Sequence, residues 1–586
     1  MMVITGAGIV SAIGHNKAQV LDALRAGRSG IRPIRYLDTA HRHLPVGEVQ
    51  LSNEEMAGLL GVECTESTSR TTLLGALALR EAVQEAGLQA DQLPQTALVS
   101  GTTVGNMDRA ERLFPSEDAC QALGDCGRVT REMAAIVGAF GFTTTCSTAC
   151  SSAANAFILG ANLLRSGLYQ RVIVGGSECL SRFHFNGFRT LMILDDRPCR
   201  PFDATRAGLN LGEGAAFMVL ETAESAAQRG ATPLAVLSGW GNACDAFHQT
   251  ASSEDGQGAF LSMTQALKRA GVAPADIDYV NAHGTGTPNN DASESAALHR
   301  VFGQSLPLVS STKSMTGHTT SASGGIEMAI CLLAMQHRLV PKNLNWAQPM
   351  PDGVQPVTET LTDKPLRHVL CNSFGFGGND TSLLLSAYSG ADNKETPPAL
   401  RPVYVKSMVK YADIAPDEQP RIPPMVARRL SGVLKRALAT SLFTLQKMGV
   451  EQPDAIITGT EMGCLHETES FLKEMCLEGE TCLKPTHFIQ STHNTISSLV
   501  AIRTHTHGYN STWSHGGDSF FSALLDAWLQ LQLGDIENAL VGLHDERGEC
   551  ALSLFLDTQL KGALLPLRRL DDLEKTVALF TENIQR

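Results

Sequence analysis

Short apolar runs alternate with longer segments of helical periodicity along most of the chain. Residues 70–86 carry apolar side chains at helical spacing and stop at Gly87, which predicts a helix that ends at a glycine. Between such segments lie apolar runs of strand length, at residues 3–5, 96–101, 171–176, 277–282 and 367–372. Buried strands separated by helices predict an α/β architecture built in layers.

The first strand, Val3 to Thr5, is followed by Gly6 and Gly8. This arrangement could begin a dinucleotide-binding loop, but Ser11 stands where that pattern has its third glycine. A tight turn out of the strand is therefore the better interpretation.

The clearest break in composition lies at residues 389–402, which are polar and contain two adjacent prolines. Such a segment predicts a linker. A new strand-like run, Val403 to Val405, follows it. The chain thus divides into a long front part and a shorter tail.

The tail repeats a portion of the front part. Residues 508–545 align without gaps on residues 141–178, at an offset of 367, and residues 457–463 resemble residues 99–105. The shared order of strand, long loop, helix and strand predicts that the tail is a second copy of the first part of the chain, and of that part only. The identical pairs are Gly141/Gly508, Thr145/Thr512, Ser147/Ser514, Ser152/Ser519, Ala156/Ala523, Leu164/Leu531, Gly167/Gly534, Val174/Val541 and Gly175/Gly542.

Composition excludes several classes of protein. With 43% apolar and 18% charged residues among 586, the chain can bury a large core, so global disorder is excluded. The net charge of −13 argues against a general nucleic-acid binder, which would lean basic. The 14 cysteines include no CxxC pair, the amino terminus has no basic leader, and no long uncharged apolar run appears. We therefore expect a cytoplasmic protein with reduced thiols and no membrane span.

The densest chemical motif is TTTCSTACSSAANAF, at residues 143–157. Cys150 stands directly before a helical run that reaches about Ser166 and ends at Gly167. The positive end of the helix dipole stabilises a thiolate, so we expect the pKa of Cys150 to fall. A buried structural cysteine is the alternative interpretation, and it is assigned to Cys146 in the same strip.

Three further loops carry groups that could act with this cysteine. His283 follows a strand in NAHGTGTPNND (281–291), and Lys313 and His318 lie in SSTKSMTGH (310–318). The glycine-rich segment NSFGFGGND (372–380) can present backbone N–H groups to an oxyanion. A single histidine of this kind is more often structural. The four loops together predict an active site.

These motifs, in this order, resemble those of the β-ketoacyl-acyl carrier protein synthases of the elongating type. The resemblance covers residues 1 to about 388 and includes VITGAGIVSAIG at the start and RPFDATRAGLNLGEGAAFMVLE at 200–221. It implies the thiolase fold, an α-β-α-β-α layered sandwich of two similar halves that is usually dimeric. The implied units are 1–235, an amino-terminal half with the nucleophile; 236–388, a carboxy-terminal half with both histidines; 389–402, the linker; and 403–586, a degenerate thiolase-like amino-terminal half.

The resemblance also implies the roles of individual residues. Cys150 accepts the acyl group, while His283 and His318 drive decarboxylation of the malonyl unit. The supporting residues are Lys313, which holds the second histidine loop; Glu327, which supports that network; Phe376, the gate beside the acyl pocket; and Thr285 and Thr287, which contact the pantetheine arm. Asp380 departs from the family, which often has Asn at this position.

The implied function is that of a 3-oxoacyl-acyl carrier protein synthase in fatty acid or polyketide/aryl-polyene-type chain elongation. An acyl-cysteine is condensed with malonyl-acyl carrier protein, and two His N–H groups stabilise the enolate without a metal. No cofactor is expected besides the phosphopantetheine of the carrier protein. A thiolase-like transferase using coenzyme A would need a second cysteine in an acid-base loop. Cys371 instead lies on a predicted strand.

The tail lacks these catalytic groups. Gly517 stands opposite Cys150, Trp513 opposite Cys146 and His515 opposite Thr148, and no second copy of the histidine loops follows. The tail resembles the amino-terminal half of a chain-length-factor-like subunit, which is non-catalytic. A scaffold or specificity subunit of a heteromeric synthase is therefore the alternative function. The pair His505 and His507 has no cysteine or carboxylate at ligand spacing, so no metal site is expected.

Two expectations concern partners. An acidic carrier protein would dock on a local basic patch, for which Arg70, Arg128 and Arg131 are candidates. The protein either forms a homodimer or uses its tail as an intramolecular pseudo-dimer partner. In the second case Phe520 and Phe521, which replace Ala153 and Ala154, fill the start of the repeated helix.

Overall fold

The computed structural model describes residues 1–114, 123–390 and 399–581. The front part, residues 1–388, is called the catalytic part below because it carries the predicted active site. It contains two sets of five strands that share one order. The first set runs β1-β7-β6-β4-β5 and the second runs β8-β12-β11-β9-β10. The strands are β1 (Met2–Ser11), β4 (Ala97–Gly101), β5 (Phe142–Cys146), β6 (Arg171–Glu178), β7 (Gly214–Thr222), β8 (Ala235–Cys244), β9 (Tyr279–Asn281), β10 (Leu308–Ser310), β11 (His368–Gly375) and β12 (Asn379–Ser386).

Helices cover and separate these sheets. Helices α7 (Ser152–Arg165) and α13 (Ser323–His337) pack on each other, α7 against β4 and β6 and α13 against β7 and β11. Both are buried around nearly their whole circumference, as helices between two sheets must be. Helix α3 (Arg70–Glu85) covers β1 and β7, and α10 (Gln257–Ala270) covers β8 and β12. The expected α-β-α-β-α layering is confirmed.

The tail forms a third set of five strands. Its order, β13-β17-β16-β14-β15, repeats that of β1-β7-β6-β4-β5. The offset of 367 is kept by β15 against β5 and by α19 (Ser519–Gln532) against α7. The expected degenerate copy of the amino-terminal half is therefore confirmed. Its strands are β13 (Val403–Lys410), β14 (Ala455–Gly459), β15 (Tyr509–Trp513), β16 (Asn538–His544) and β17 (Ala551–Asp557), followed by β18 (Leu565–Leu567).

The described residues of the tail, 399–581, include no counterpart of the second half that would cover α19. Helix α20 (Leu570–Thr581) packs on α19 instead, as α13 packs on α7. The rings of Phe520 and Phe580 meet edge to face with centroids 6.3 Å apart, and both side chains are buried. The predicted filling of the helix start by Phe520 is thus completed by the last described helix.

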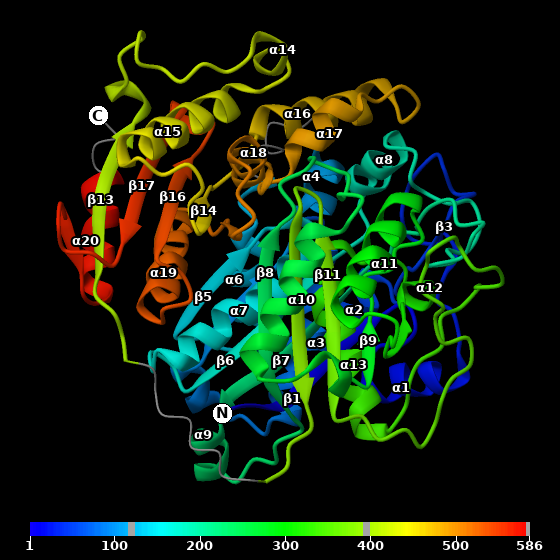
Figure 1. Cartoon of the computed structure of the whole chain (residues 1–586). Helices are drawn as coiled ribbons and strands as arrows, with labels where there is room; N and C mark the ends of the chain where they lie inside the picture. The colour runs from blue at the N-terminus through cyan, green and yellow to red at the C-terminus, as the bar shows by residue number, and fades with distance from the viewer. Residues whose placement is uncertain (115–122, 391–398, 582–586) are drawn as a thin grey trace.

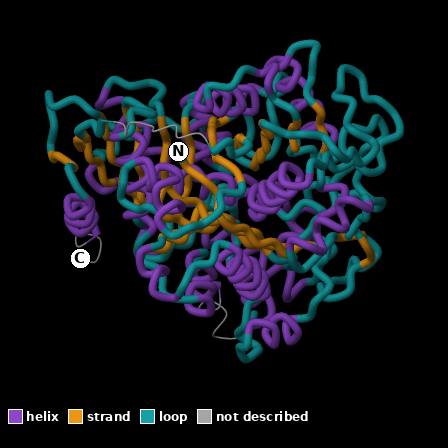
Figure 2. The backbone as a smooth tube through the Cα atoms, turned by 90° about the horizontal axis from the view of Figure 1, so that it is seen from below, coloured by secondary structure: helices purple, strands orange, loops and turns teal. Residues whose placement is uncertain are grey.

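The tail lies along the catalytic part (Figure 1, yellow to red) and joins its sheet. Strand β15 meets β5 in antiparallel fashion, with Trp513 opposite Cys146. Two backbone bonds fix this joint, Ser147 N–H to Thr512 O at 2.8 Å and Ser514 N–H to Thr145 O at 2.9 Å. In the view from below, the strands form a band with helices on both sides (Figure 2).

Side chains also link the two parts. Asp535 of the tail binds Arg165, at the end of α7, at 2.6 Å and Arg269, at the end of α10, at 3.1 Å. Trp240 lies under both guanidinium groups. These partly buried charges fix the tail at the edge away from Cys150, because Arg165 stands at the opposite end of α7 from the nucleophile.

The predicted linker, 389–402, includes residues 391–398, which lie outside the described residues. None of the helices in the described ranges is long and apolar enough to cross a membrane. The remaining elements are α1 (Lys17–Ala26), β2 (Arg32–Pro33), β3 (Pro45–Val46), α2 (Asn53–Leu60), α4 (Met107–Leu113), α6 (Gly127–Val137), α8 (Arg182–Thr190), α9 (Ala223–Gln228), α11 (Pro288–Phe302), α12 (Lys313–Thr316), α14 (Pro424–Ala427), α15 (Gly432–Met448), α16 (Leu465–Lys473), α17 (Pro485–Ser491) and α18 (Thr495–Thr504).

Candidate active site

Cys150 stands in a short 3₁₀ turn, Ala149–Ser151, that leads into α7. Ala149 has a φ of 51°, a left-handed conformation that is uncommon for a residue with a side chain. Ser152 holds the turn, because its hydroxyl accepts from the Thr148 N–H at 2.9 Å and donates to Ala149 O at 2.6 Å. The thiol is thereby placed at the start of the helix, where it is only 4% exposed.

His318 is the nearest base to this thiol. Its Nε2 lies 3.1 Å from the Sγ of Cys150, and its Nδ1 lies 3.1 Å from the hydroxyl of Ser323. A hydroxyl can donate or accept, so Ser323 accommodates either tautomer of His318. The ring can therefore face the thiol with a bare Nε2 or with an N–H.

His283 follows β9, and its ring lies 5.3 Å from that of His318, nearly perpendicular to it. Lys313 Nζ lies 3.2 Å from His283 Nδ1 and 2.5 Å from Glu327 Oε1. Because an ammonium can only donate, Nδ1 of His283 must accept, and the ring proton resides on Nε2. The lysine thus fixes His283 as an N–H donor.

Burial keeps both histidines neutral. The pKa values of His283 and His318 lie well below their ordinary value because burial disfavours the cation, and Lys313 adds to the effect. Burial also raises the pKa of Glu327 to about 7, against the attraction of Lys313. The site therefore offers neutral imidazole N–H groups rather than imidazolium ions.

The expected fall in the pKa of Cys150 is wrong. Burial raises it to about 11, although Lys313 and the backbone N–H groups of Phe376 and Cys150 act in the opposite direction. The helix terminus is fully enclosed, so the loss of hydration outweighs the charges that favour a thiolate. In the free protein Cys150 is a thiol, and it must lose its proton as it reacts.

The glycine-rich loop completes the site. Gly377 and Gly378, just after Phe376, have φ values of 85° and 74°, which lets the chain turn sharply back into β12. The backbone N–H of Phe376 lies close enough to the sulfur of Cys150 to favour its thiolate form. Its ring stacks on Phe188, with centroids 5.6 Å apart and planes within 16°. Two backbone N–H groups, those of Cys150 and Phe376, thus converge on the sulfur.

The sequence matches known families over most of its length. Residues 1–226 match the β-ketoacyl synthase amino-terminal domain and residues 234–347 its carboxy-terminal domain, while residues 405–557 match the amino-terminal domain a second time. The chain is 33% identical, over 414 residues, to 3-oxoacyl-[acyl-carrier-protein] synthase 1 of Haemophilus influenzae, covering 66% of this chain and 99% of that protein. The chain belongs to the β-ketoacyl synthase family.

Solved structures agree with this ketosynthase assignment. The ishigamide ketosynthase/chain length factor is 33% identical with a TM-score of 0.62, over 66% of this chain and 99% of that one. The PfaC Keto synthase-Chain length factor is 16% identical with a TM-score of 0.78, over 95% of this chain and 78% of that one. The second likeness shows that the shared fold extends through the tail of this ketosynthase.

The two threonines expected to contact pantetheine lie together in the first histidine loop. The hydroxyls of Thr285 and Thr287 are 2.9 Å apart, and Thr287 precedes α11. The same loop is held by Glu294, which sequence reasoning missed. Its carboxylate accepts from the N–H groups of His283 at 2.8 Å and Gly284 at 2.7 Å. The sequence feature that could have indicated this role is an acidic residue on the helix that follows the loop, eleven residues after His283.

Asp380, the residue that departs from the expected pattern, lies at the start of β12, directly after the glycine-rich loop. It is 6% exposed, and burial raises its pKa well above the ordinary value, with Asp245 and Glu294 adding to the shift. The neighbouring Asn379 takes part in an amide network, because its Oδ1 accepts from Ser151 and Asn155 at 2.7 Å. This network ties the loop to the start of α7.

Arg70 cannot be a docking residue for a carrier protein, and that expectation is wrong. It is 7% exposed, and its guanidinium bonds Glu213 at 2.6 Å and the carbonyls of Val49 and Leu51 at 2.9 Å. Its position at the start of α3 faces inward rather than to solvent. Arg128 and Arg131 retain partly exposed side chains, at 31% and 43%.

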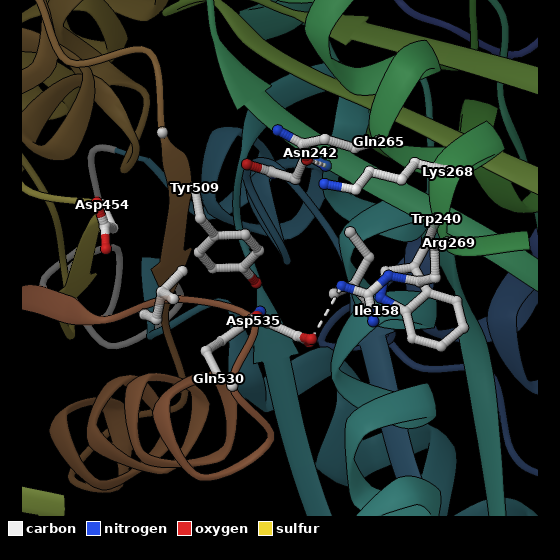
Figure 3. A pocket seen from close by; sticks show the side chains of 14 residues that line it. Ile158, Trp240, Asn242, Gln265, Lys268, Arg269, Asp454, Tyr509, Gln530 and Asp535 are labelled. Atoms are coloured by element: carbon white, nitrogen blue, oxygen red, sulfur yellow. Dashed lines mark hydrogen bonds and ion pairs between the residues drawn. The ribbon is translucent and has the colours of Figure 1, made fainter. Parts of the chain in front are cut away.

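Two cavities lie outside the catalytic centre. A cavity of about 580 Å³ opens between α10 and the tail, where Arg269 meets Asp535 beside Trp240, Lys268 and Tyr509 (Figure 3). Its lining comes from both parts of the chain and does not include Cys150, His283 or His318, so it belongs to the joint rather than to the candidate active site. A smaller hollow of about 20 Å³ is lined by Val104, Met107, Leu123, Gly124, Cys126, Phe183, Met462, Thr468, Ser491 and His493.

The tail also reaches the centre directly. Phe488, on α17, contacts Phe188 with centroids 5.6 Å apart, and Phe188 in turn stacks on Phe376, the predicted gate. Sequence reasoning placed no tail residue at the site, because the repeat aligned residues of the two copies without showing which of them face Cys150.

Proposed function

We propose that this chain is a 3-oxoacyl-acyl carrier protein synthase whose substrates are carried on phosphopantetheine. The observation that carries the proposal is the convergence on Cys150 of His318 at 3.1 Å and of two backbone N–H groups, beside a second neutral histidine oriented by Lys313. The relatives named as acyl-carrier-protein synthases support it.

The first half-reaction transfers the acyl group to Cys150. The thiol loses its proton to the bare Nε2 of His318 as sulfur attacks the thioester carbonyl. The oxyanion is stabilised by the N–H groups of Cys150 and Phe376, each of which can contribute on the order of 3 kcal/mol. The carrier thiolate leaves and takes the proton back from His318, so the net result is acyl-enzyme and carrier thiol.

The second half-reaction forms the carbon–carbon bond. A malonyl thioester binds with its carbonyl oxygen between the Nε2–H groups of His283 and His318. Loss of CO₂ leaves an enolate, whose oxygen these neutral donors stabilise. The enolate carbon attacks the acyl carbonyl on Cys150, the carbon–sulfur bond breaks, and the released thiolate takes up one proton from solvent. Ser323 permits the Nε2–H tautomer of His318 that this step needs.

A thiolase-like reaction with coenzyme A is less consistent with the site. Cys371 lies within β11 and is 2% exposed. Contact with Cys331 and burial raise its pKa well above the ordinary value. It thus lies within a strand rather than in the acid-base loop that thiolysis would require.

For the tail we propose a non-catalytic role as a built-in partner that also bounds the acyl pocket. Gly517, opposite Cys150, is exposed, and a side chain there would meet nothing within 4 Å. The alternative, a purely non-catalytic scaffold for the whole chain, conflicts with the assembled catalytic groups of the front part. Phe183, Phe471 and Phe488 form the aromatic contact between the pocket and the tail.

Intact-mass analysis of the protein after incubation with acyl-carrier thioesters tests the proposed activity. We expect one acyl adduct on Cys150, its absence in Cys150→Ala, and continued malonyl decarboxylation in Cys150→Gln, in which both histidines remain. Peptide mapping of the adduct to Cys146 would refute the assignment. A wild-type protein that takes no acyl group would support the scaffold alternative.

A further inference from the structure

Asn494, in the tail, is placed where an asparagine would normally cap its own helix. It stands at the N-cap of α18, a position at which the side-chain oxygen usually accepts from the first turn. Here it makes no capping bond, and its Oδ1 has no hydrogen-bond partner, although the residue is 1% exposed. Its side chain is therefore engaged elsewhere.

That engagement is with the loop over the active site. The Nδ2 of Asn494 donates to the carbonyl of Phe376 at 2.8 Å. One turn along α18, Ser498 lies directly against the next residue of the loop, because a Cβ added at Gly377 would come within 2.1 Å of the Ser498 hydroxyl. The first turn of α18 thus supports the loop from below, by one hydrogen bond and one close contact.

The pseudo-symmetry of the molecule makes this contact one-sided. The offset of 367 places Asn494 opposite Gly127, and the residues just before them, His493 and Cys126, touch each other across the joint. Gly127 has no side chain, and a Cβ there would lie 2.5 Å from the ring of His515. The tail therefore has an amide side chain at this position, directed at the loop beside Cys150, whereas the equivalent position of the catalytic part has none.

We propose that Asn494 is a positioning residue through which the tail holds the oxyanion site of Cys150. The inference rests on the ketosynthase activity proposed above. The carbonyl of Phe376 is the group that Asn494 binds, and the N–H of the same residue is near enough to the sulfur of Cys150 to favour its thiolate form. Fixing the peptide after Phe376 restricts rotation of the residue, so its N–H stays directed at the oxygen of the transition state. The catalytic centre is therefore incomplete without the tail.

Two rates measured on the full-length protein separate this role from a general structural one. The first is single-turnover acylation of Cys150 by the hexanoyl thioester of N-acetylcysteamine, which needs an oxyanion site but no carrier docking. The second is alkylation of Cys150 by iodoacetamide, which needs the thiol alone. Asn494→Ala should slow acylation on the order of 10-fold or more and leave alkylation and the unfolding temperature nearly unchanged.

Two further variants complete the test. Asn494→Asp keeps the size of the side chain but removes its N–H donors, so it should slow acylation as Asn494→Ala does. Asp535→Asn weakens the joint far from the loop and should leave acylation as in the wild type. Unchanged acylation in Asn494→Ala, or an equal fall in acylation and alkylation, would overturn the proposal. Failure of the wild type to be acylated would instead refute the ketosynthase activity.

Discussion

At the scale of single residues, buried carboxyl groups hold the catalytic loops and are themselves costly to bury. Glu294 binds the backbone of the first histidine loop, and burial raises its pKa to about 7. Asp380 directly follows the glycine-rich loop, and the nearby carboxyl groups of Asp245 and Glu294 raise its pKa further. The two residues differ in what the burial of each carboxyl group achieves. Glu294 orients a catalytic group, whereas the described residues provide no cation paired with Asp380.

Replacing Glu294 should therefore impair the second half-reaction selectively. Glu294→Gln keeps the size of the side chain but offers one acceptor where two N–H groups now bind, so the His283 loop loses one hydrogen bond. We expect malonyl decarboxylation to fall roughly 10-fold, because His283 acts mainly in that step. Release of CO₂ from malonyl-carrier protein measures it. Acyl transfer to Cys150 is the internal control, and an equal loss in both steps would contradict a role through His283.

Replacing Asp380 should change stability in a pH-dependent way. Its pKa is raised well above the ordinary value, so the folded protein keeps a proton that the unfolded chain loses above a pKa of about 3.9. Its contribution to the free energy of unfolding therefore becomes less favourable as the pH rises from there through the folded pKa. Asp380→Asn removes that loss and should stabilise the protein more at about pH 8 than at about pH 5.

Urea unfolding at both pH values measures this effect. Asp196→Asn is the matched control, since that carboxyl is 78% exposed and should change stability little at either pH. A gain from Asp380→Asn that is equal at both pH values would show that Asp380 does not carry the titration.

At the scale of elements, the tail keeps the five strands and the central helix of the amino-terminal half. Helix α20 covers the central helix, as α13 does in the catalytic part. Burial of α19 is completed by α20, in which Leu573, Thr576 and Phe580 face inward. A half of this fold would otherwise expose the apolar side of its central helix, which is the face that α13 covers in the catalytic part. A single added helix thus covers the apolar side of α19 in this half-length copy of the fold.

The contact between Phe520 and Phe580 tests this interpretation. Phe580→Ala removes a buried ring from the α19–α20 contact and should lower the free energy of unfolding of the tail by about 3–5 kcal/mol. Leu579→Ala, one residue away on the same helix, changes a side chain that is 49% exposed and should cost far less. Hydrogen exchange of α19 and thermal unfolding measure both. Equal effects of the two substitutions would contradict the covering role of α20.

The sequence allowed the repeat and the catalytic loops to be predicted because both depend on local spacing. The offset of 367 carries strand, helix and strand together, and each catalytic residue sits in a loop directly beside an apolar run. The burial of Arg70 and the high pKa of Cys150 could not be predicted in this way, because both depend on what encloses the residue. The same holds for Asn494, whose partner lies 118 residues earlier in the chain.

At the scale of the whole molecule, the proposed role of the tail is that of a built-in second subunit. One apolar cluster runs from Cys146, Phe157 and Leu163 in the catalytic part to Trp513 and Leu524 in the tail. The β5 edge, which would otherwise be open to pairing with another chain, is met by β15. Together with the Arg165 and Arg269 pairs to Asp535, this joint combines an apolar interior with charged anchors at its rim.

Truncation after Ser389 separates the two possible roles of the tail. If the tail is the built-in partner, the shortened protein exposes the β5 edge and the apolar side of α7. It should then aggregate or form a new dimer through those surfaces, because an unpaired edge next to a large apolar face is a site of association. It should also lose the support of Phe376 from Asn494 and the contact of Phe488 with Phe188 beside the proposed acyl pocket, so the lengths of its products should change. Light scattering coupled to size-exclusion chromatography, with mass spectrometry of the products, measures both. An unchanged oligomeric state together with unchanged product lengths would mean that the catalytic part finds its partner in another copy of itself and that the tail serves neither purpose.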